Sequence, residues 1–153
     1  MTPFSDVYDL FLIMVTDYKL DNLYASSEED FLIYLRGFLI PAITKFTNCN
    51  QSLAWSTDED DIDNFSSDLT DSEKNILAEL MSIQWLNKEI NNVTQINLHL
   101  NDTDFKHYAE SQNLKEKVAH RDGLREIYNQ DIVDYGLINI DWTAWGSGNY
   151  GDA

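Results

Sequence analysis

The stretch that decides the fold runs from residue 70 to residue 90 and reads TDSEKNILAELMSIQWLNKEI. Thr70 and Glu73 have the spacing of a capping box, in which each side chain accepts a hydrogen bond from the other residue's backbone N–H. The apolar residues that follow recur at intervals of three and four, as on one face of a helix. The sequence therefore predicts a helix that begins after Thr70 and ends near Asn91 or Asn92.

A second helix is predicted from Ser27, on the N-terminal side of the first. Glu28, Glu29 and Asp30 place three acids in its first turn, where the helix dipole favours negative charge. Its apolar residues cover more than one face, so we expect it at the centre of the core or buried in an oligomer. Pro41 is expected to kink this helix or to end it one residue early.

A third helix is predicted at the N-terminus, with Thr2 as its N-cap and Pro3 at its first position. Its apolar stripe begins at Phe4. We expect this helix to end between Asp17 and Asn22.

A fourth helix is predicted from Thr103-Asp104 to a stop at Gly136. The preceding residues, 96–100, alternate between apolar and polar, which is a strand-like pattern. Uninterrupted, residues 104–135 would span roughly 48 Å, whereas a domain of this length is about 38 Å across. We therefore expect a break near Gly123 or a helix that projects beyond the body.

The connector over residues 47–69 looks irregular, with short extended pieces possible at 53–55 and 62–65. It carries five acids within six positions, and long loops of this kind are often functional. A calcium loop needs a glycine turn, and no glycine lies between Gly37 and Gly123, so a solvated or phosphate-repelling loop is favoured over a metal site. The acids are Asp58, Glu59, Asp60, Asp61 and Asp63.

Residues 137–153 change character and are predicted to form an extended aromatic arm beside a helical domain of residues 1–136. The arm either folds back over its own core or docks on a neighbour, and Trp and Tyr are typical interface anchors. Its candidate docking residues are Ile138, Ile140, Trp142, Trp145 and Tyr150. The fold class predicted is all-α, with four main helices in a bundle, the long acidic connector and this arm.

The charge of the chain restricts its partners. There are 10 basic and 27 acidic residues, a net charge of −17, which argues against binding a nucleic-acid backbone or an anionic membrane. Five of the basic residues fall between residues 106 and 125, where the net charge is +2. An acidic body with one basic helix can pair with copies of itself.

No catalytic or cofactor motif is evident. The single cysteine, Cys49, excludes an intrachain disulfide and has no neighbouring motif that would activate it as a nucleophile. The three histidines do not have the spacing of a metal site. We therefore expect no enzyme activity, no cofactor and no metal.

Four segments spread over most of the chain, at residues 3–9, 29–41, 68–86 and 105–114, have a familiar pattern. In these segments the sequence resembles the head–tail connector, or portal adaptor, proteins of tailed bacteriophages that infect Gram-positive bacteria. This resemblance implies a mostly helical virion protein that forms a ring, usually of twelve copies, beneath the portal.

The same resemblance implies partners and a location. The ring would extend the DNA channel, contact the next neck protein and lie in the neck of the virion, after synthesis in the host cytoplasm. The C-terminal segment would dock on the portal, a role that falls here on Ile138, Ile140, Trp142, Trp145 and Tyr150. Packaged DNA would only pass through, because an anionic wall repels phosphate.

One rival interpretation stays open from the composition. A free-standing acidic protein, such as a DNA mimic or an inhibitor of a basic host protein, would also be strongly anionic. It would be a monomer or dimer and would have no need for an aromatic arm.

Overall fold

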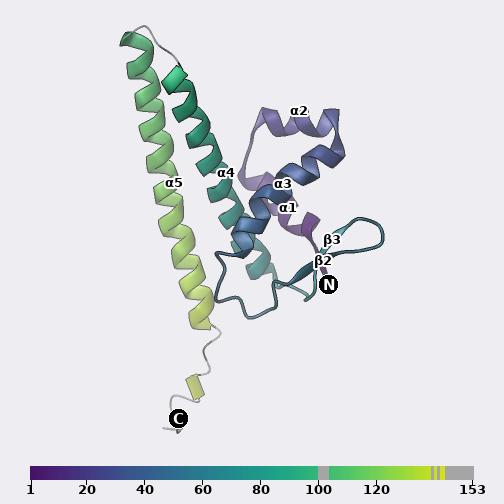
Figure 1. Ribbon diagram of the computed structural model, residues 1–153. Coiled ribbons are helices and arrows are strands. Elements are labelled where there is room, and N and C mark those ends of the chain that lie inside the picture. The colour runs from purple at the N-terminus through teal and green to yellow at the C-terminus, as the bar shows by residue number, and fades with distance from the viewer. Residues whose placement is uncertain (100–103, 139, 141, 144–153) are drawn as a thin grey trace.

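The computed structural model describes residues 1–99, 104–138, 140, 142 and 143. It is 74% helical, with five helices and a small three-stranded antiparallel sheet, so the predicted helical class is confirmed (Figure 1). In chain order the elements are β1 (Thr2–Pro3), α1 (Phe4–Met14), α2 (Tyr18–Ser26), α3 (Glu28–Ile43), β2 (Trp55–Thr57), β3 (Asp63–Phe65), α4 (Asp71–His99) and α5 (Asp104–Ile138).

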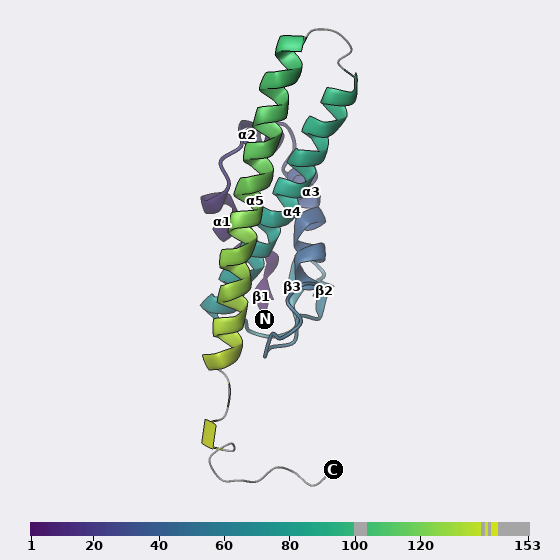
Figure 2. The same cartoon turned by 90° about the vertical axis from the view of Figure 1, so that its left-hand side faces the viewer.

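The central element is α4, which packs against α1, α3 and α5. The helices α1 to α3 lie on one side of it and α5 lies along the other, as the two perpendicular views show (Figures 1 and 2). The apolar stripe predicted for this helix is the core, since Leu77 and Met81 have no exposed surface and Ile76, Leu80 and Leu86 are buried. By contrast, α5 packs mainly against α4, and Tyr135 near its C-terminal end also contacts Phe46 and Asn50.

Both predicted helix starts at Ser27 and Thr70 are confirmed. The Ser27 hydroxyl accepts a hydrogen bond from the Asp30 N–H at 3.2 Å. The Thr70 hydroxyl accepts from the Glu73 N–H at 3.3 Å, and the Glu73 carboxylate accepts from the Thr70 N–H at 2.7 Å. These local bonds satisfy N–H groups that a helix leaves unpaired at its first turn.

The N-terminal prediction was wrong in two respects. Thr2 is not a helix cap: it lies in β1, and its hydroxyl accepts a hydrogen bond from the Leu69 N–H at 2.8 Å. Pro3 is the N-cap of α1 instead. The helix ends at Met14, and a separate helix, α2, begins at Tyr18, capped by the Asp17 side chain.

The helices of the C-terminal half are longer than predicted. The backbone of α4 continues to His99, so the strand-like pattern over residues 96–99 forms helix, while Leu100 lies outside the described residues. A strand needs a partner for its N–H and C=O groups, whereas each residue added to a helix pairs within the helix. In the N-terminal half, α3 also does not end before Pro41, which was one of the two alternatives predicted there; it continues to Ile43.

No break occurs in α5 at Gly123, and the helix passes Gly136 to end at Ile138. At 1.5 Å per residue its 35 residues span roughly 52 Å. Of the two alternatives predicted for this helix, a break or a projection beyond the body, the second is correct. The hairpin of α4 and α5 is longer than the body that α1 to α3 form beside it (Figure 1).

The connector is partly ordered into the sheet: β3 lies within the piece predicted at 62–65, whereas β2 overlaps the piece predicted at 53–55 only at Trp55. The strand order is β1-β3-β2, with Thr2 opposite Phe65 and Trp55 also opposite Phe65. Phe65 has no exposed surface, and its ring lies 4.7 Å from that of Phe4 in α1. This contact fastens the sheet to the helical core.

Candidate functional site

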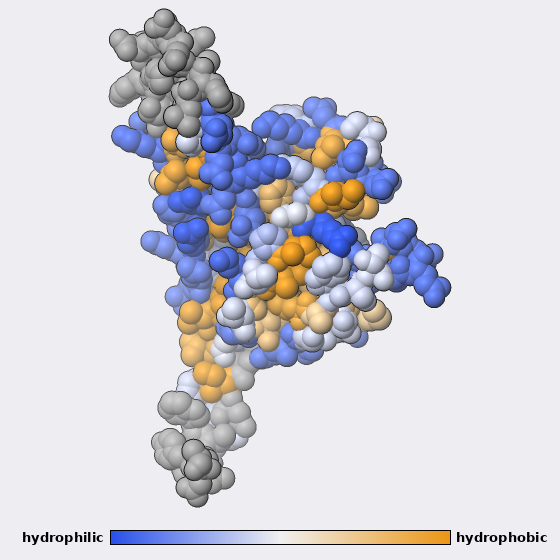
Figure 3. Space-filling view, in the orientation of Figure 1, coloured by the Kyte–Doolittle hydropathy of each residue, from blue (hydrophilic) through white to orange (hydrophobic). Residues whose placement is uncertain are grey.

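The predicted docking arm begins at the far end of α5. Ile138 is the last residue of the helix and its exposed fraction is 82%. Ile140 is half-buried, and Trp142, which is 59% exposed, forms a helical turn with Thr143. Trp145 and Tyr150 lie outside the described residues. The arm residues that the structure describes therefore place apolar surface at one end of the molecule (Figure 3).

The predicted acidic residues lie on the hairpin between β2 and β3, and Asp58 organises its turn. One carboxylate oxygen of Asp58 accepts hydrogen bonds from the N–H groups of Asp60 and Ile62, at 3.0 and 2.9 Å. The other accepts from the Asn64 side-chain amide at 3.0 Å. Asp61 has a positive φ of 60° and completes the turn. The Asp58 side chain is thus structural, whereas Glu59, Asp60 and Asp61 are exposed at the tip.

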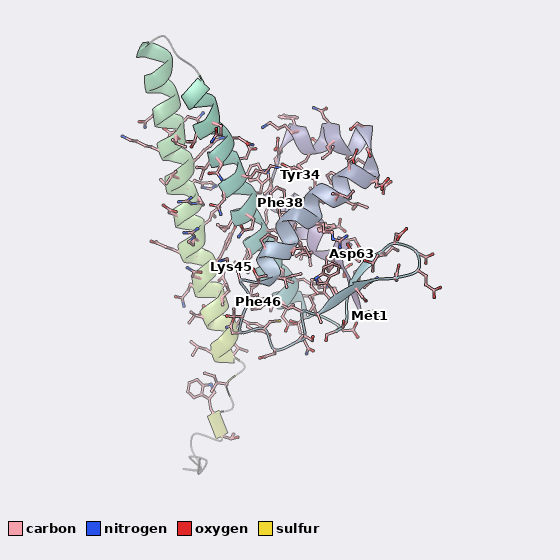
Figure 4. The ribbon with its side chains drawn as sticks, in the orientation of Figure 1. Met1, Tyr34, Phe38, Lys45, Phe46 and Asp63 are labelled. Atoms are coloured by element: carbon pink, nitrogen blue, oxygen red, sulfur yellow. The ribbon has the colours of Figure 1, made fainter. Side chains whose placement is uncertain are left out.

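Asp63 is also structural and lies at the base of the hairpin (Figure 4). Its carboxylate is 3.2 Å from the Arg36 guanidinium and accepts a hydrogen bond from the Thr57 hydroxyl at 2.7 Å. The guanidinium also lies 4.7 Å from the centroid of the Trp55 ring. Arg36 therefore joins α3 to both strands of the hairpin.

A groove between α1, α2 and α3 was missed by the sequence analysis. Its volume is about 440 Å³. Its floor is apolar, and four carboxylates line it, those of Asp9, Asp17, Asp21 and Glu28. These acids are spread over twenty positions and three helices, so no local pattern groups them. Only the turn between α1 and α2, which was not predicted, brings them together.

A buried carboxylate at the base of α4 was missed as well. Glu73 is only 1% exposed, and one of its oxygens accepts hydrogen bonds from the Tyr135 hydroxyl at 2.6 Å and from the Gln51 N–H at 3.3 Å. Burial raises the pKa of Glu73, but hydrogen bonds from Tyr135 and Thr70 outweigh it, and the net pKa lies below its usual value. The charged side chain thus joins α4, the connector and α5.

Cys49 belongs to the same cluster and is not set up as a nucleophile. Its sulfur lies 3.5 Å from the Glu73 carboxylate. Burial, with a smaller contribution from that negative charge, raises the pKa of Cys49 to about 11. A thiol with such a pKa stays protonated near neutral pH, so it supplies little thiolate.

Glu79 faces a second hollow, of about 540 Å³, between α4 and α5. One of its oxygens is buried and has no hydrogen-bond partner within the described part of the chain. Burial, and then the negative charge of Asp131 on α5, raise the pKa of Glu79 to about 7.

The described residues contain neither a candidate metal site nor a candidate membrane-spanning helix. No group of three or more His, Cys, Asp or Glu side chains among them could hold a metal ion. None of their helices combines the length and the apolar character needed to cross a membrane.

Comparison with known proteins adds no relative to these observations: no protein-family model, no curated protein and no solved structure matches this chain.

Proposed function

We propose that this chain is a structural protein of the neck of a tailed bacteriophage. In this role it is a head–tail adaptor that forms a ring of twelve copies beneath the portal protein. The ring extends the DNA channel and links the head to the tail or to the next neck protein. The chain has no enzymatic step to perform in this role, and DNA passes through the ring without being bound.

The observation that carries the proposal is the apolar end of α5. Leu137 and Ile138 are exposed there, and Trp142 follows them. Fully burying one such side chain is worth roughly 1.5–3 kcal/mol, so these residues gain free energy when a partner covers them. Because Trp142 and the nearby Trp145 are of the type enriched at interface hot spots, this end is suited to docking on the portal.

The acidic hairpin supports the channel part of the proposal. Glu59, Asp60 and Asp61 are exposed at its tip, and the whole chain carries a net charge of −17. In Figure 1 the hairpin extends away from the helices. A ring of such chains would present negative potential to DNA, which lowers the local affinity for phosphate and lets the duplex slide.

The test is a truncation after Ile138, made in the phage genome. We expect the truncated chain to keep its helical circular dichroism spectrum and melting temperature, because the core lies before this point. We also expect it to be absent from purified particles, which would lack tails by electron microscopy. The matched point variant is Trp142→Ala with Trp145→Ala, and Thr143→Ala is the control that should assemble normally.

Normal particles from both the truncation and the double tryptophan variant would refute the arm hypothesis. A full-length chain that is missing from purified wild-type particles would refute the neck role itself. In that case its recovery as a monomer bound to a basic host protein would favour the acidic inhibitor.

A further inference from the structure

The hollow between α4 and α5 lies beside the end of α5 that is proposed to dock. Its volume is about 540 Å³, and Ile138, the exposed last residue of α5, is part of its lining. Leu137, which precedes Ile138, is exposed as well. The hollow and the apolar end of α5 therefore form one continuous surface, and a partner seated on that end also covers the hollow.

Two carboxylates in the hollow have no cation. One oxygen of Glu79 on α4 is buried without a hydrogen-bond partner in the described part of the chain, and neither Glu79 nor Asp131 on α5 forms an ion pair there. Burial, and then the charge of Asp131, raise the pKa of Glu79, so the two side chains are near enough to interact. Glu73 and Asp134, which also line the hollow, already accept hydrogen bonds from side chains of α5.

A partner that docks on the end of α5 takes Glu79 and Asp131 out of water. Burying an unpaired charge is unfavourable, whereas a buried charge that is paired and hydrogen-bonded is tolerated. Apolar contacts at Leu137 and Ile138 do nothing for these two carboxylates. The partner must therefore bring a cation into the hollow, or Glu79 must take up a proton.

The lining of the hollow favours a guanidinium group as that cation. No group of three or more metal-ligating side chains occurs among the described residues. The two free carboxylates come from different helices, and the neutral side chains of Ser72 and Asn75 lie in the same lining. A guanidinium carries five N–H donors in one plane and can bond to two carboxylates at once, whereas an ammonium is a compact charge with three donors. The methylene stem of an arginine can lie on Ile76 and Ile138.

We propose that the hollow between α4 and α5 receives an arginine side chain of the protein on which the end of α5 docks, and that Glu79 and Asp131 bind its guanidinium group. The inference rests on the proposed neck role and deepens it, because it states which charged group the docking partner carries beside its apolar site. Arginine is enriched at interface hot spots. An arginine held between two carboxylates also fixes the orientation of docking.

The first experiment introduces three variants into the phage genome. Glu79→Gln with Asp131→Asn removes both charges and keeps the shapes of the side chains. Asp131→Lys places an ammonium group beside Glu79, so that the chain supplies the cation itself. The control is Glu126→Lys, which makes the same charge change at an exposed position of α5. Thermal melting of each purified chain, followed by circular dichroism, establishes that the variants are folded.

We expect the neutral pair and Asp131→Lys each to lower the copy number of the chain in purified particles roughly tenfold or more, because the arginine of the partner would be buried without its carboxylates. The Glu126→Lys control should be incorporated like the wild-type chain. A melting temperature at or above that of the wild-type chain would show that the loss is not due to unfolding.

The second experiment distinguishes an arginine from a proton. Purified chain is added at pH 6 and at pH 8 to heads from phage that lack its gene, and the bound amount is measured. Burial, and then the charge of Asp131, raise the pKa of Glu79 to about 7, so the charged fraction of Glu79 rises roughly tenfold between these pH values. Association should strengthen by about this factor if an arginine enters the hollow, and should weaken if the hollow is covered with Glu79 protonated. The other ionisable side chains that line the hollow are Glu73, Asp131, Asp134 and Tyr135. Glu79→Gln should remove the dependence that Glu79 causes and leave any that they cause.

Two results would overturn the inference. One is normal incorporation of both the neutral pair and Asp131→Lys, and the other is wild-type association that weakens from pH 6 to pH 8. Neither result bears on the neck role, which fails only if the wild-type chain is missing from purified particles. Normal particles from the truncation after Ile138, together with the expected loss in the charge variants, would remove the arm hypothesis and leave the arginine site in place.

Discussion

Tyr135→Phe removes one oxygen atom from α5 and should destabilise the fold. The Tyr135 hydroxyl donates to the Glu73 carboxylate at 2.6 Å and accepts from the Asn50 N–H at 3.0 Å. Its ring packs edge-on against Phe46, with 5.3 Å between centroids, and phenylalanine keeps this contact. The substitution therefore isolates the hydroxyl group.

The magnitude follows from the charge of Glu73. A hydrogen bond to an ionised group contributes about 1.5–3 kcal/mol, and the Asn50 N–H also loses its acceptor. Glu73 keeps its bonds from Thr70 and Gln51, so the carboxylate is not left without donors. We expect the free energy of unfolding to fall by about 2–3 kcal/mol at pH 7. For a chain of this length the melting temperature should fall by roughly 6 °C.

The assay is urea denaturation at micromolar protein concentration, with Tyr128→Phe as the matched control. Tyr128 lies two turns earlier on the same side of α5, and its hydroxyl is 3.5 Å from the Ser82 hydroxyl, which makes a weak bond at most. The control should cost less than about 0.5 kcal/mol. Equal midpoints for the two variants would refute the assignment of Glu73 as the charge that holds α5 to α4. A second measurement is amide exchange, which should accelerate at Asn50 in the Tyr135 variant alone.

Two further predictions concern Glu79 and Phe65. The fold raises the pKa of Glu79 from its ordinary value of 4.5 to about 7. Between these two pH values the folded state binds more protons than the unfolded state. The free energy of unfolding should therefore fall as the pH rises from 4.5 to 7. Glu79→Gln should remove this loss, so the free energy of unfolding should rise by about 1–2 kcal/mol at pH 8 and hardly change at pH 4. Unfolding curves that show the same rise at both pH values would contradict this prediction. Phe65→Ala should lower the free energy of unfolding by about 3–5 kcal/mol, because the ring is fully buried against Phe4. The control Ile62→Ala, at an exposed position on the same hairpin, should lower it by less than about 0.5 kcal/mol in the same denaturation assay. A similar loss from both variants would show that Phe65 does not hold the sheet on the core.

Local signals in the sequence predicted the helix starts but not all of the helix ends. The capping box at Thr70 and the acids after Ser27 act within one turn, so they can be recognised without the rest of the fold. By contrast, a helix end was predicted near Asn91, and a break near Gly123 was one of two alternatives for the last helix; both residues lie inside helices. Each costs a helix at most about 1 kcal/mol, which the packing of α4 on α5 outweighs.

The candidate surfaces also divide into those formed by one continuous stretch of sequence, which could be predicted, and those assembled from distant segments, which could not. The C-terminal arm and the acidic hairpin are each continuous in sequence, and both were predicted as candidate sites, although the start of the arm was expected to be extended and Ile138 lies in α5. The groove was not, because its carboxylates come from three helices, one of which was not expected. The Glu73 cluster was missed for a similar reason: its capping bond to Thr70 is local, but Tyr135 lies 62 residues away and reaches it only through the antiparallel return of α5.

The positions of these surfaces constrain the architecture of the proposed ring. In a closed ring, every copy is related to its neighbour by rotation about one axis. The C-terminal ends of all α5 helices then lie at the same level and on the same face of the ring. Each arm needs only modest affinity, because once one arm has docked on the portal the others bind at a high effective concentration. A ring is therefore the arrangement in which two or three apolar side chains per copy are sufficient to fix the neck.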